Sequence, residues 1–374
     1  MLQHLYIDNY RCFVNFELDI DPALLLIGGN GAGKSSVIDV LRLLRDFALG
    51  QCNAEDAFTT DSLNWWQDRD EQTFELKVGL SAGTYTYRLV VHHESERQTS
   101  RVAQEDVHLD GKPLIEFAEG DLRLYNDRLV RGAQFQLDPS RSGLSFVVPR
   151  HDNTKLIAFR NWLGALTALR LNPFGLTSLS EREEERLAVD GSNFASWYRG
   201  RLLEDPAGAS ELLALLQPVL PDLVAICLEA AGRSRALSYR FSQPAAGARG
   251  KTQTCDLAML SEGQRALAVL YAVYQKHRAG DGALVCVDEP DNFLALTEIE
   301  PWLNLMRDAA DDGVLQFLVS SHHPEVINAM VPDQAMVLSR EGSGPARARR
   351  FRYDGELLLT PAEVMARGWD DGEA

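Results

Sequence analysis

The sequence predicts an α/β fold in which a parallel sheet is joined by an antiparallel β subdomain and a helical insertion. Continuous apolar runs at residues 24–27 and 284–287 are typical of strands that are buried on both faces. The first run leads directly into a Gly-rich loop and then an amphipathic helical pattern, as in a strand–loop–helix unit. Between the two runs, alternating strand-like segments come first and helical periodicity follows.

The composition is that of an ordinary globular protein. The 374 residues include 37 basic and 54 acidic side chains, which give a formal charge of −17, and 45% are hydrophobic. These proportions exclude a disordered, collagenous or disulfide-stapled chain. The five cysteines are scattered without the spacing of a zinc site, which predicts a reducing, cytoplasmic location. No signal-peptide pattern and no apolar run near the ~20 residues that cross a bilayer is found, so we expect no membrane partner.

Residues 1–154 are expected to form the N-terminal lobe. Alternating apolar residues within 5–20 predict a first strand and its hairpin partner. The helical pattern after the Gly-rich loop continues to Gly50, and a glycine just past the last apolar position is a typical helix end.

Residues 72–150 are predicted to be an antiparallel sheet within this lobe. Alternating segments on either side of Gly83 indicate one hairpin, and the Asp110-Gly111 pair indicates another. Residues 144–148 are expected to add a further strand.

Residues 155–235 are expected to form a helical insertion, or arm, because Leu156 and Leu163 fall on one helical face. The charge run at 181–186 is best explained as a solvated helix face, and a binding patch is the less favoured alternative. Residues 236–374 are expected to form the C-terminal lobe. It begins with a flexible loop rich in Gly and Ala and ends with a short helix and an acidic tail.

A Gly-rich motif carries the clearest chemical signal. The stretch Gly28-Gly29-Asn30-Gly31-Ala32-Gly33-Lys34-Ser35 matches G-x-x-x-x-G-K-[ST] in full. Glycines let backbone N–H groups wrap around a β-phosphate, and the following helix N-terminus adds partial positive charge. Lys34 can bridge the β- and γ-phosphates, and the Ser35 hydroxyl can bind Mg²⁺. The predicted nucleotide-binding residues of this phosphate loop are Gly28, Asn30, Gly31, Ala32, Gly33, Lys34, Ser35 and Ser36.

Two adjacent carboxylates end a second apolar strand. Asp288 and Glu289 follow the buried run at 284–287. Asp288 is suited to hold Mg²⁺ through its water shell, and Glu289 is suited to orient the attacking water. An acidic turn at a strand end is the plain alternative, but the presence of a phosphate loop in the same chain makes it less favoured.

A second anion-binding segment is predicted at Ser261-Glu262-Gly263-Gln264, directly before an apolar helix. Taken alone, Ser261 could be a plain helix N-cap. Because the segment precedes the two carboxylates in a chain that also carries a phosphate loop, we interpret Ser261, Gly263 and Gln264 as part of a composite nucleotide site. A fourth element, Ser320-Ser321-His322-His323, follows another strand. We assign His322 to the γ-phosphate and interpret His323 as structural.

These four elements, in this order, resemble the ABC-type ATPase heads of the RecF/SMC/OLD group. The L-S-G-G-Q signature of the group is similar to Leu260-Ser261-Glu262-Gly263-Gln264, and its N-F-R-x-F opening is similar to Asn9-Tyr10-Arg11-Cys12-Phe13. The turn at 288–294 and the Ser-His-His-Pro turn look like the stand-alone prokaryotic AAA_21-type ATPases. The resemblance covers residues 1–70 and 255–340.

The resemblance implies an ATPase that uses ATP and Mg²⁺. Glu289, His322 and Lys34 would be its catalytic residues, Ser35 and Asp288 would hold the metal, and Arg11 would also contact the nucleotide. The active form would be an ATP-dependent head-to-tail homodimer or higher oligomer, in which Ser261 and Gly263 act in trans on the partner's ATP. Many members of that class work beside a nuclease in anti-phage or toxin–antitoxin operons. This implies an effector subunit on a second chain, such as a nuclease of the Toprim or HNH type.

The sequence departs from the pattern of that group at two points. Glu262 stands in place of the second signature residue, and a carboxylate near the nucleotide would weaken ATP-driven closure. The glutamine that couples Mg²⁺ to the inserted domain is not fixed; Gln134 and Gln136 are the candidates.

Three functions stay open at this point. The first is an ATPase that switches a partner effector in prokaryotic anti-phage defence. The second is a RecF-like DNA-binding repair ATPase, in which arginines within 347–352 contact phosphates, although an edge strand protected by charge explains them better. The third is a slow-hydrolysing, nucleotide-gated scaffold. The effector, the trigger and any nucleic acid partner are not determined by the sequence.

Overall fold

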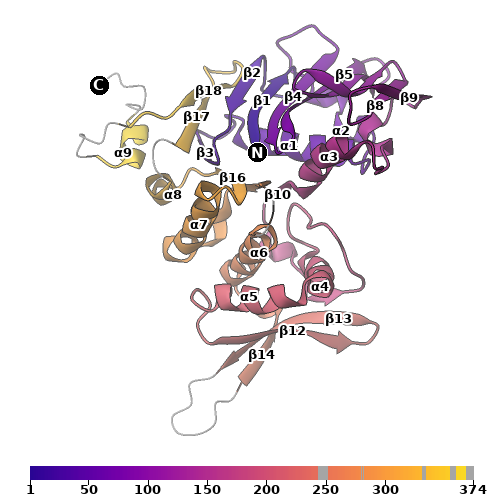
Figure 1. The fold of residues 1–374 in the computed structure, drawn as a ribbon. Coiled ribbons are helices and arrows are strands. Elements are labelled where there is room, and N and C mark those ends of the chain that lie inside the picture. Colours follow the sequence, from indigo (N-terminus) through magenta and orange to yellow (C-terminus); the bar gives the residue numbers. More distant parts are fainter. Residues whose placement is uncertain (243–251, 279, 281, 331–333, 354–358, 368–374) are drawn as a thin grey trace, which may run out of the picture.

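The computed structural model describes residues 1–374 apart from 243–251, 279, 281, 331–333, 354–358 and 368–374. In the described part the chain forms an α/β molecule with three sheets. A six-stranded, mainly parallel sheet lies between an eight-stranded antiparallel sheet and a smaller antiparallel sheet at the far end of the molecule (Figure 1). The predicted fold class is confirmed, since both the parallel sheet and the antiparallel subdomain are present.

The parallel sheet is the centre of the fold. Its strand order is β10-β15-β16-β3-β17-β18, and only β18 runs antiparallel to its neighbour. All residues of β3, β15 and β16 are buried, as their apolar runs predict. The strands are β3 (Ala23–Ile27), β10 (Thr167–Leu169), β15 (Ala283–Asp288), β16 (Leu315–Ser320), β17 (Ala335–Ser339) and β18 (Arg347–Arg350).

Successive residues of these strands face two different hydrophobic cores. Leu24 and Leu26 of β3 pack with α1 (Lys34–Ala48) and α3 (Thr154–Ala165). Leu25 and Ile27 pack with α6 (Glu262–His277) and α7 (Leu296–Asp311). A strand covered on both sides therefore needs an apolar residue at every position, which is why its sequence does not alternate.

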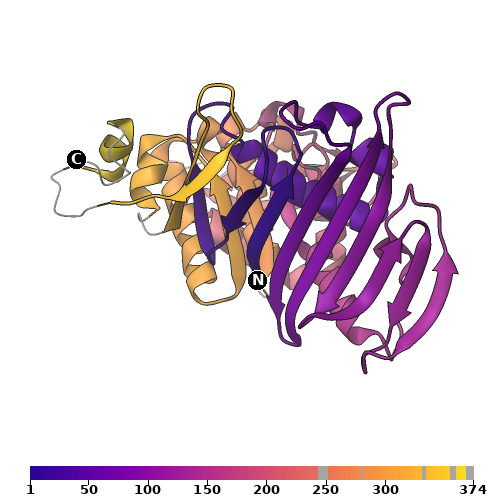
Figure 2. The same ribbon diagram turned by 90° about the horizontal axis from the view of Figure 1, so that it is seen from above.

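The antiparallel sheet covers α1 and α3 on their outer side (Figure 2). Its two-residue turn at Asp110-Gly111 has φ of 48° and 77°, the left-handed pair that a tight hairpin requires. The predicted antiparallel subdomain and both of its hairpin turns are therefore confirmed. The eight strands are β1 (Leu2–Asp8), β2 (Phe16–Asp19), β4 (Glu71–Leu80), β5 (Gly83–Glu94), β6 (Thr99–Leu109), β7 (Lys112–Ala118), β8 (Asp121–Tyr125) and β9 (Arg131–Gln136).

The strand expected at 144–148 is not formed. Its first residues belong to a 3₁₀ turn, η2 (Gly143–Phe146). The Ser142 hydroxyl accepts the N–H of Leu144, and the buried Glu105 carboxylate accepts the Ser142 hydroxyl and the Gly143 N–H, each at 2.6 Å. These local side-chain bonds take the place of strand pairing.

The insertion expected to be helical is helical only in part. Beyond α3, helices form at α4 (Phe194–Glu204) and α5 (Pro206–Leu216). β10 joins the parallel sheet, and β12 (Leu223–Ala231) belongs to the small antiparallel sheet. The apolar pattern of β12 suits either structure, but residues with positive φ at both of its ends, Asp222 and Gly232, favour a strand bounded by turns. The other strands of this sheet are β11 (Leu179–Ser180), β13 (Ser234–Ser242) and β14 (Thr252–Asp256).

The charge run at 181–186 is likewise not helical. The Asn193 amide donates to the carbonyl of Arg186 and its side-chain oxygen accepts the N–H of Ala188 at 2.7 Å, which holds the segment as an irregular loop before α4. The expectation of a solvated helix face is therefore wrong for this segment.

The short C-terminal helix expected from the sequence is α9 (Pro361–Ala366), which begins with a capping box between Thr360 and Glu363. The shorter helices are α2 (Ala54–Ala57) and α8 (Pro324–Ala329). The loop at 243–251 and the acidic tail lie outside the described residues. Within the described ranges, no helix combines the length and apolar character needed to cross a bilayer. The lobe boundaries at 154 and 235 stay predictions.

Candidate nucleotide-binding site

The Gly-rich loop lies between the carboxyl end of β3 and the start of α1. Gly28, Gly31 and Gly33 all have positive φ, at 145°, 77° and 109°. A Cβ at Gly28 would overlap the backbone oxygen of Leu338 in β17. The glycines of the motif are therefore required by the path of the backbone, before any ligand is considered.

The N-terminus of α1 has no side-chain cap among the described residues. Its N-cap, Gly33, offers no side chain, and the first turn contains no acidic residue. The first N–H groups of a helix have no intrahelical partner and carry partial positive charge. They therefore fit the oxygens of a phosphate group.

A cavity of about 430 Å³ lies in front of this loop. Lys34 reaches it, while its buried ammonium donates to the carbonyl oxygens of Gly28 at 2.7 Å and Gly29 at 3.3 Å. Arg11 and Glu289, from distant parts of the sequence, also line it. The residues around it are Arg11, Cys12, Asn30, Gly31, Ala32, Gly33, Lys34, Ser35, Ser36, Trp65, Trp66, Glu289 and Arg340. Of the predicted phosphate-loop residues, only Gly28 lies outside this lining.

Asp288 lies at the buried end of β15. Its side chain accepts a bond from the Arg170 guanidinium at 2.6 Å and another from the Ser320 hydroxyl. The Ser35 hydroxyl and the Asp288 carboxylate are hard oxygen donors of the kind that Mg²⁺ prefers. The chemistry of these two donors therefore fits Mg²⁺.

Glu289 follows with a strained backbone, at φ 49°. Its N–H donates to the carbonyl of Ser320 at 3.0 Å. Its carboxylate accepts the Asn292 amide at 3.0 Å and lies 3.2 Å from Nδ1 of His322. The structure thus brings together Glu289 and His322, which are 33 positions apart in the sequence. A non-glycine residue in the left-handed region is typical of functional sites.

The neighbouring histidine has a different role. The ring of His323 accepts the N–H of Glu325 at 3.2 Å and caps α8. This is the structural role that the sequence indicated.

The segment at 261–264 does not line the cavity. Ser261 caps α6 and forms a reciprocal capping box with Gln264. A Cβ on Gly263 would lie 3.0 Å from the backbone oxygen of Phe293, so this glycine permits close packing of α6 on η5 (Pro290–Phe293). One chain therefore brings together the phosphate loop, the carboxylates and His322, and leaves Ser261, Gly263 and Gln264 on the surface elsewhere.

Arg170 is a residue of this site that sequence reasoning missed. It follows β10, which pairs with β15, and its guanidinium contacts both Asp288 and, at 3.9 Å, Asp39. Asp39 in turn accepts a bond from Arg11 at 2.8 Å. The three-residue strand that precedes Arg170 is too short to stand out within a helical pattern.

The two glutamines that are candidates for coupling Mg²⁺ to the inserted domain lie in β9, away from the cavity. Gln134 accepts a bond from Arg131, and Gln136 pairs with Asp121. Among the described residues, the side chain that connects Asp288 to the insertion is Arg170.

Trp65 and Trp66 were also missed. Both line the cavity, Trp65 is 74% exposed, and the guanidinium of Arg340 lies 5.6 Å from the Trp66 ring. Arg340 also donates to the carbonyl of Gly31 at 3.2 Å. Exposed aromatic rings beside a phosphate loop offer a flat surface to a nucleobase.

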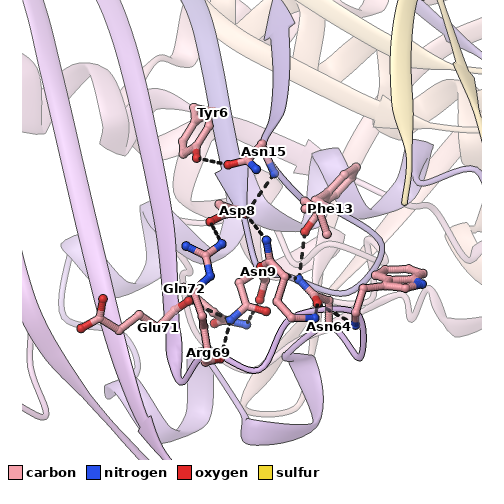
Figure 3. Close-up of polar contacts among 12 residues, drawn as sticks. Tyr6, Asp8, Asn9, Phe13, Asn15, Asn64, Arg69, Glu71 and Gln72 are labelled. Carbon is pink, nitrogen blue, oxygen red and sulfur yellow. Dashed lines mark hydrogen bonds and ion pairs between the residues drawn. The ribbon is translucent and has the colours of Figure 1, made fainter. Parts of the chain in front are cut away.

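A polar network holds the loop that carries Trp65 and Trp66 against the N-terminal segment 8–13 (Figure 3). Asp8 pairs with Arg69 at 2.6 Å, and the buried Asn9 amide donates to the carbonyls of Arg69 and Glu71. The Asn64 side chain accepts the N–H of Trp66 at 3.0 Å. Asn9 is therefore a scaffold residue, while Arg11 two positions later reaches the cavity.

Three solved structures share this architecture. The chain aligns over 98% of its length with 99% of an Smc head bound to the C-terminal winged-helix domain of ScpA, with a TM-score of 0.58 and 13% identity. The chain also aligns over 100% of its length with 99% of an Smc head with an extended coiled coil from Pyrococcus furiosus, with a TM-score of 0.57 and 12% identity. For an Smc head with a coiled coil and joint from Pyrococcus yayanosii, the alignment covers 98% of this chain and 99% of that structure, with a TM-score of 0.55 and 10% identity. These likenesses show the SMC-head fold.

An OLD nuclease from Thermus scotoductus is 21% identical in an alignment of 346 residues that covers 87% of this chain. The chain spans only 59% of the length of that relative. The family described as "AAA domain, putative AbiEii toxin, Type IV TA system" matches residues 24–328, a range that contains the phosphate loop, both carboxylates and His322. The chain therefore belongs to this AAA family, and it is an ATPase of the ABC/SMC/OLD type.

Proposed function

We propose that this chain binds ATP with Mg²⁺ at the phosphate loop and hydrolyses it. The observation that carries the proposal is the convergence of three features on one cavity. The uncapped N-terminus of α1, the Lys34 ammonium and the Glu289 carboxylate all open onto it. Together they supply hydrogen-bond donors for phosphate oxygens and a carboxylate that can act as a general base.

The binding residues have distinct roles. Backbone N–H groups from 31–35 hold the β-phosphate, and Lys34 exchanges its bonds with the loop carbonyls for bonds to the β- and γ-phosphates. Mg²⁺, held by Ser35 and Asp288, would neutralise charge that develops on the phosphates. Trp65 and Trp66 offer their rings to the base.

Hydrolysis is assigned to Glu289. Its carboxylate orients the attacking water, and the hydrogen bond from Asn292 and the 3.2 Å contact with His322 fix the carboxylate in place. His322 is half exposed, with 50% of its side-chain surface accessible, so it can turn to the γ-phosphate when nucleotide is present.

The complete site needs a second copy of the chain. Ser261, Gly263 and Gln264 lie outside the cavity of their own chain, and beside them Met259 and Phe174 are each 69% exposed. An exposed apolar flank is typical of a surface that another protein covers. We propose a head-to-tail homodimer in which this segment closes over the partner's ATP, and in which hydrolysis reopens the dimer.

We further propose that the dimer switches an effector in anti-phage defence, with a nuclease of the Toprim or HNH type as the first candidate. Two comparisons support this: the family description names a toxin of a toxin–antitoxin system, and the relative from Thermus is a nuclease.

DNA binding through β18 is less favoured. Arg347 donates to the carbonyl of Val14 at 2.9 Å, and Arg350 pairs with Asp21 at 2.8 Å. β18 is an edge strand of the parallel sheet, and charged side chains on an edge protect it from pairing with other chains.

The proposal is tested by the mass of Glu289→Gln in solution, measured by light scattering with and without Mg-ATP. Blocking hydrolysis should trap the closed dimer, so we expect the mass to double with Mg-ATP. The substitution Ser261→Arg should abolish the increase, because its side chain would occupy the trans site, and Lys34→Ala should abolish it through loss of binding. A mass that stays monomeric in Glu289→Gln while ATP is bound would refute the homodimer.

A further inference from the structure

Arg170 places a positive charge directly beside Asp288, one of the two residues proposed to hold Mg²⁺. Its Nε donates to Oδ2 of Asp288 at 2.6 Å. The side chain of Asp288 is 2% exposed and that of Arg170 is 50% exposed, so the ion pair lies at the boundary between the interior and the surface. Salt screens a partly buried pair much less than an exposed one, so the two charges act strongly on each other and on a third ion nearby.

The strand pairing explains why these two side chains meet. β10 runs parallel to β15, and Leu169 is opposite Val287. The next residues along the two strands are Arg170 and Asp288. On the other side of β15, Ser320 of β16 is paired with Asp288, and its hydroxyl donates to Oδ1. Each oxygen of the carboxylate therefore accepts a bond from the carboxyl end of a neighbouring strand.

The backbone after β10 is fixed as well. The N–H of Arg170 donates to the carbonyl of Val189 at 2.8 Å, and the N–H of Asn172 donates to the carbonyl of Asp190 at 3.0 Å. Residues 189 and 190 lie in the loop before α4. The guanidinium of Arg170 is therefore carried by a main chain that is bonded on both sides.

The same guanidinium also approaches α1. Its Nη2 lies 3.9 Å from Oδ1 of Asp39, whose Oδ2 accepts a bond from Arg11 at 2.8 Å. Asp39 is four positions after Ser35 in α1, so the two residues share one face of the helix. Arg170 thus contacts both elements that carry the proposed metal ligands, β15 with Asp288 and α1 with Ser35.

This charge affects a bare divalent cation and a metal–nucleotide pair differently. The Arg170 guanidinium offsets the charge of Asp288 and repels a cation that approaches alone. A cation that arrives with a triphosphate brings several negative charges with it. These attract Arg170 together with Lys34 and Arg11, which line the nucleotide cavity. The repulsion therefore acts mainly against the metal alone.

We propose that Arg170 makes metal binding depend on nucleotide, by opposing a divalent cation at Asp288 unless the cation arrives with a triphosphate. The inference rests on the proposed function, because it takes Ser35 and Asp288 as the metal ligands. Arg170 does not line the nucleotide cavity, so it acts through Asp288 and is a positioning residue. If the ion pair served only to stabilise the fold, its removal would change stability and leave metal affinity unchanged.

The test measures binding of Mn²⁺ to the full-length chain without nucleotide, by electron paramagnetic resonance of the unbound ion. Mn²⁺ is a suitable probe because it prefers the same oxygen ligands as Mg²⁺. We expect Arg170→Gln to lower the dissociation constant of Mn²⁺ at least ~10-fold, because a charge beside the metal is removed. Arg170→Lys keeps the charge and should bind Mn²⁺ as weakly as the native chain does. Adding Asp288→Asn to Arg170→Gln should abolish the gain.

Arg69→Gln is the matched control. Arg69 pairs with Asp8 at the same distance, 2.6 Å, and their side chains are 53% and 5% exposed. Its removal also leaves a buried carboxylate without its cation, but Asp8 is not a proposed metal ligand, so the affinity for Mn²⁺ should not change. Thermal midpoints establish that each variant folds, and Arg170→Met provides a second variant without the charge.

The outcomes separate this inference from the proposed function. Equal Mn²⁺ affinities in the native chain and in the variants without the Arg170 charge, or an equal gain in Arg69→Gln, would overturn the inference. A fluorescent ATP analogue titrated in the presence of Mg²⁺ tests nucleotide binding independently. If the native chain binds the analogue while the Mn²⁺ affinities are equal, the inference alone fails. A native chain that binds no analogue refutes the proposed function and the inference with it.

Discussion

At the scale of single residues, the candidate site depends on backbone conformations that most side chains avoid. Glu289 adopts φ 49°, and Gly28 and Gly33 adopt φ 145° and 109°. At Glu289 the strained backbone is held by the hydrogen bond from its N–H to Ser320, by the hydrogen bond from Asn292 to its carboxylate, and by the contact of that carboxylate with His322. The surrounding structure therefore orients the carboxylate before any nucleotide arrives.

The glycine requirement can be tested without a ligand. We expect Gly28→Ala to lower the free energy of unfolding by about 1–3 kcal/mol, because a Cβ there meets the Leu338 carbonyl and φ is positive. Gly29→Ala is the matched control, since a Cβ at that position has no atom within 4 Å, and its effect should stay within about 0.5 kcal/mol. Urea unfolding measures both, and equal stabilities would contradict the expectation.

At the scale of elements, helix α6 and strand β10 hold the structure together and also position residues that are candidates for function. α6 begins at the Ser261 capping box and ends at His277, which is bonded at 2.8 Å to Thr167 at the start of β10. The opposite end of β10 leads to Arg170, which pairs with Asp288. Helix α6 and strand β10 therefore link the surface segment at 261–264 to the buried carboxylate.

The two roles of Ser261 can be separated by a pair of substitutions. Ser261→Ala removes the cap of α6 and should cost about 1 kcal/mol of unfolding free energy. Ser261→Asp keeps a capping oxygen, so its stability should match the native chain, but it places a carboxylate where we propose the partner's ATP lies. Denaturant unfolding measures the stability of each variant. Light scattering in the Glu289→Gln background measures its assembly with Mg-ATP, so the two roles of Ser261 are distinguished. A dimer that still forms with Ser261→Asp would argue against the trans role.

The end of α6 makes stability depend on pH. Burial lowers the pKa of His277 from 6.5 to about 3, with Lys276 and Arg201 adding to the shift. As pH falls below about 6.5, the unfolded chain binds this proton before the folded one does, so stability falls by up to about 1.4 kcal/mol per pH unit. We expect His277→Gln to flatten the dependence between pH 6.5 and 4.

The exposed His151→Gln serves as the control for this experiment, and it should leave the pH dependence unchanged. His93, whose pKa burial lowers to about 4, contributes in the same range in both variants, so their difference isolates His277. Chemical unfolding at a series of pH values gives the slopes. Parallel curves for the two variants would contradict the assignment.

At the scale of the whole molecule, two hydrophobic cores share the parallel sheet, and the phosphate loop lies at the carboxyl end of its strand β3. The phosphate loop and the segment at 261–264 follow different elements and do not meet in one chain. The exposed apolar side chains Met259 and Phe174 lie beside that segment. We therefore expect assembly to depend on this flank.

Met259→Glu tests this expectation. A charge on the flank should prevent the doubling of mass with Mg-ATP in the Glu289→Gln background, because a buried unpaired carboxylate is costly. Since Met259 is 69% exposed in the monomer, the free energy of unfolding should change by no more than about 0.5 kcal/mol. Leu203→Glu is the control, at 68% exposure in α4, and it should leave assembly intact. A dimer that forms normally with Met259→Glu would exclude the flank from the interface.

Local patterns in the sequence determined much of this protein. The phosphate loop, the buried strands, the hairpin at Asp110-Gly111 and the capping of α6 are encoded within short stretches, where residue type restricts φ or requires burial. The order of the four motifs was sufficient to indicate the family. The sequence assigned separate roles to Glu289 and His322, and only the fold showed that the two side chains lie 3.2 Å apart.

Only the tertiary structure decided the rest. β10 is three residues long and takes its strand form from pairing with β15, so a helical pattern around it hid both the strand and Arg170. Trp65 and Trp66 are ordinary loop residues until the network around Asn9 and Asn64 brings them to the phosphate loop. The positions of these residues depend on contacts between segments far apart in the chain, and no local pattern records such contacts.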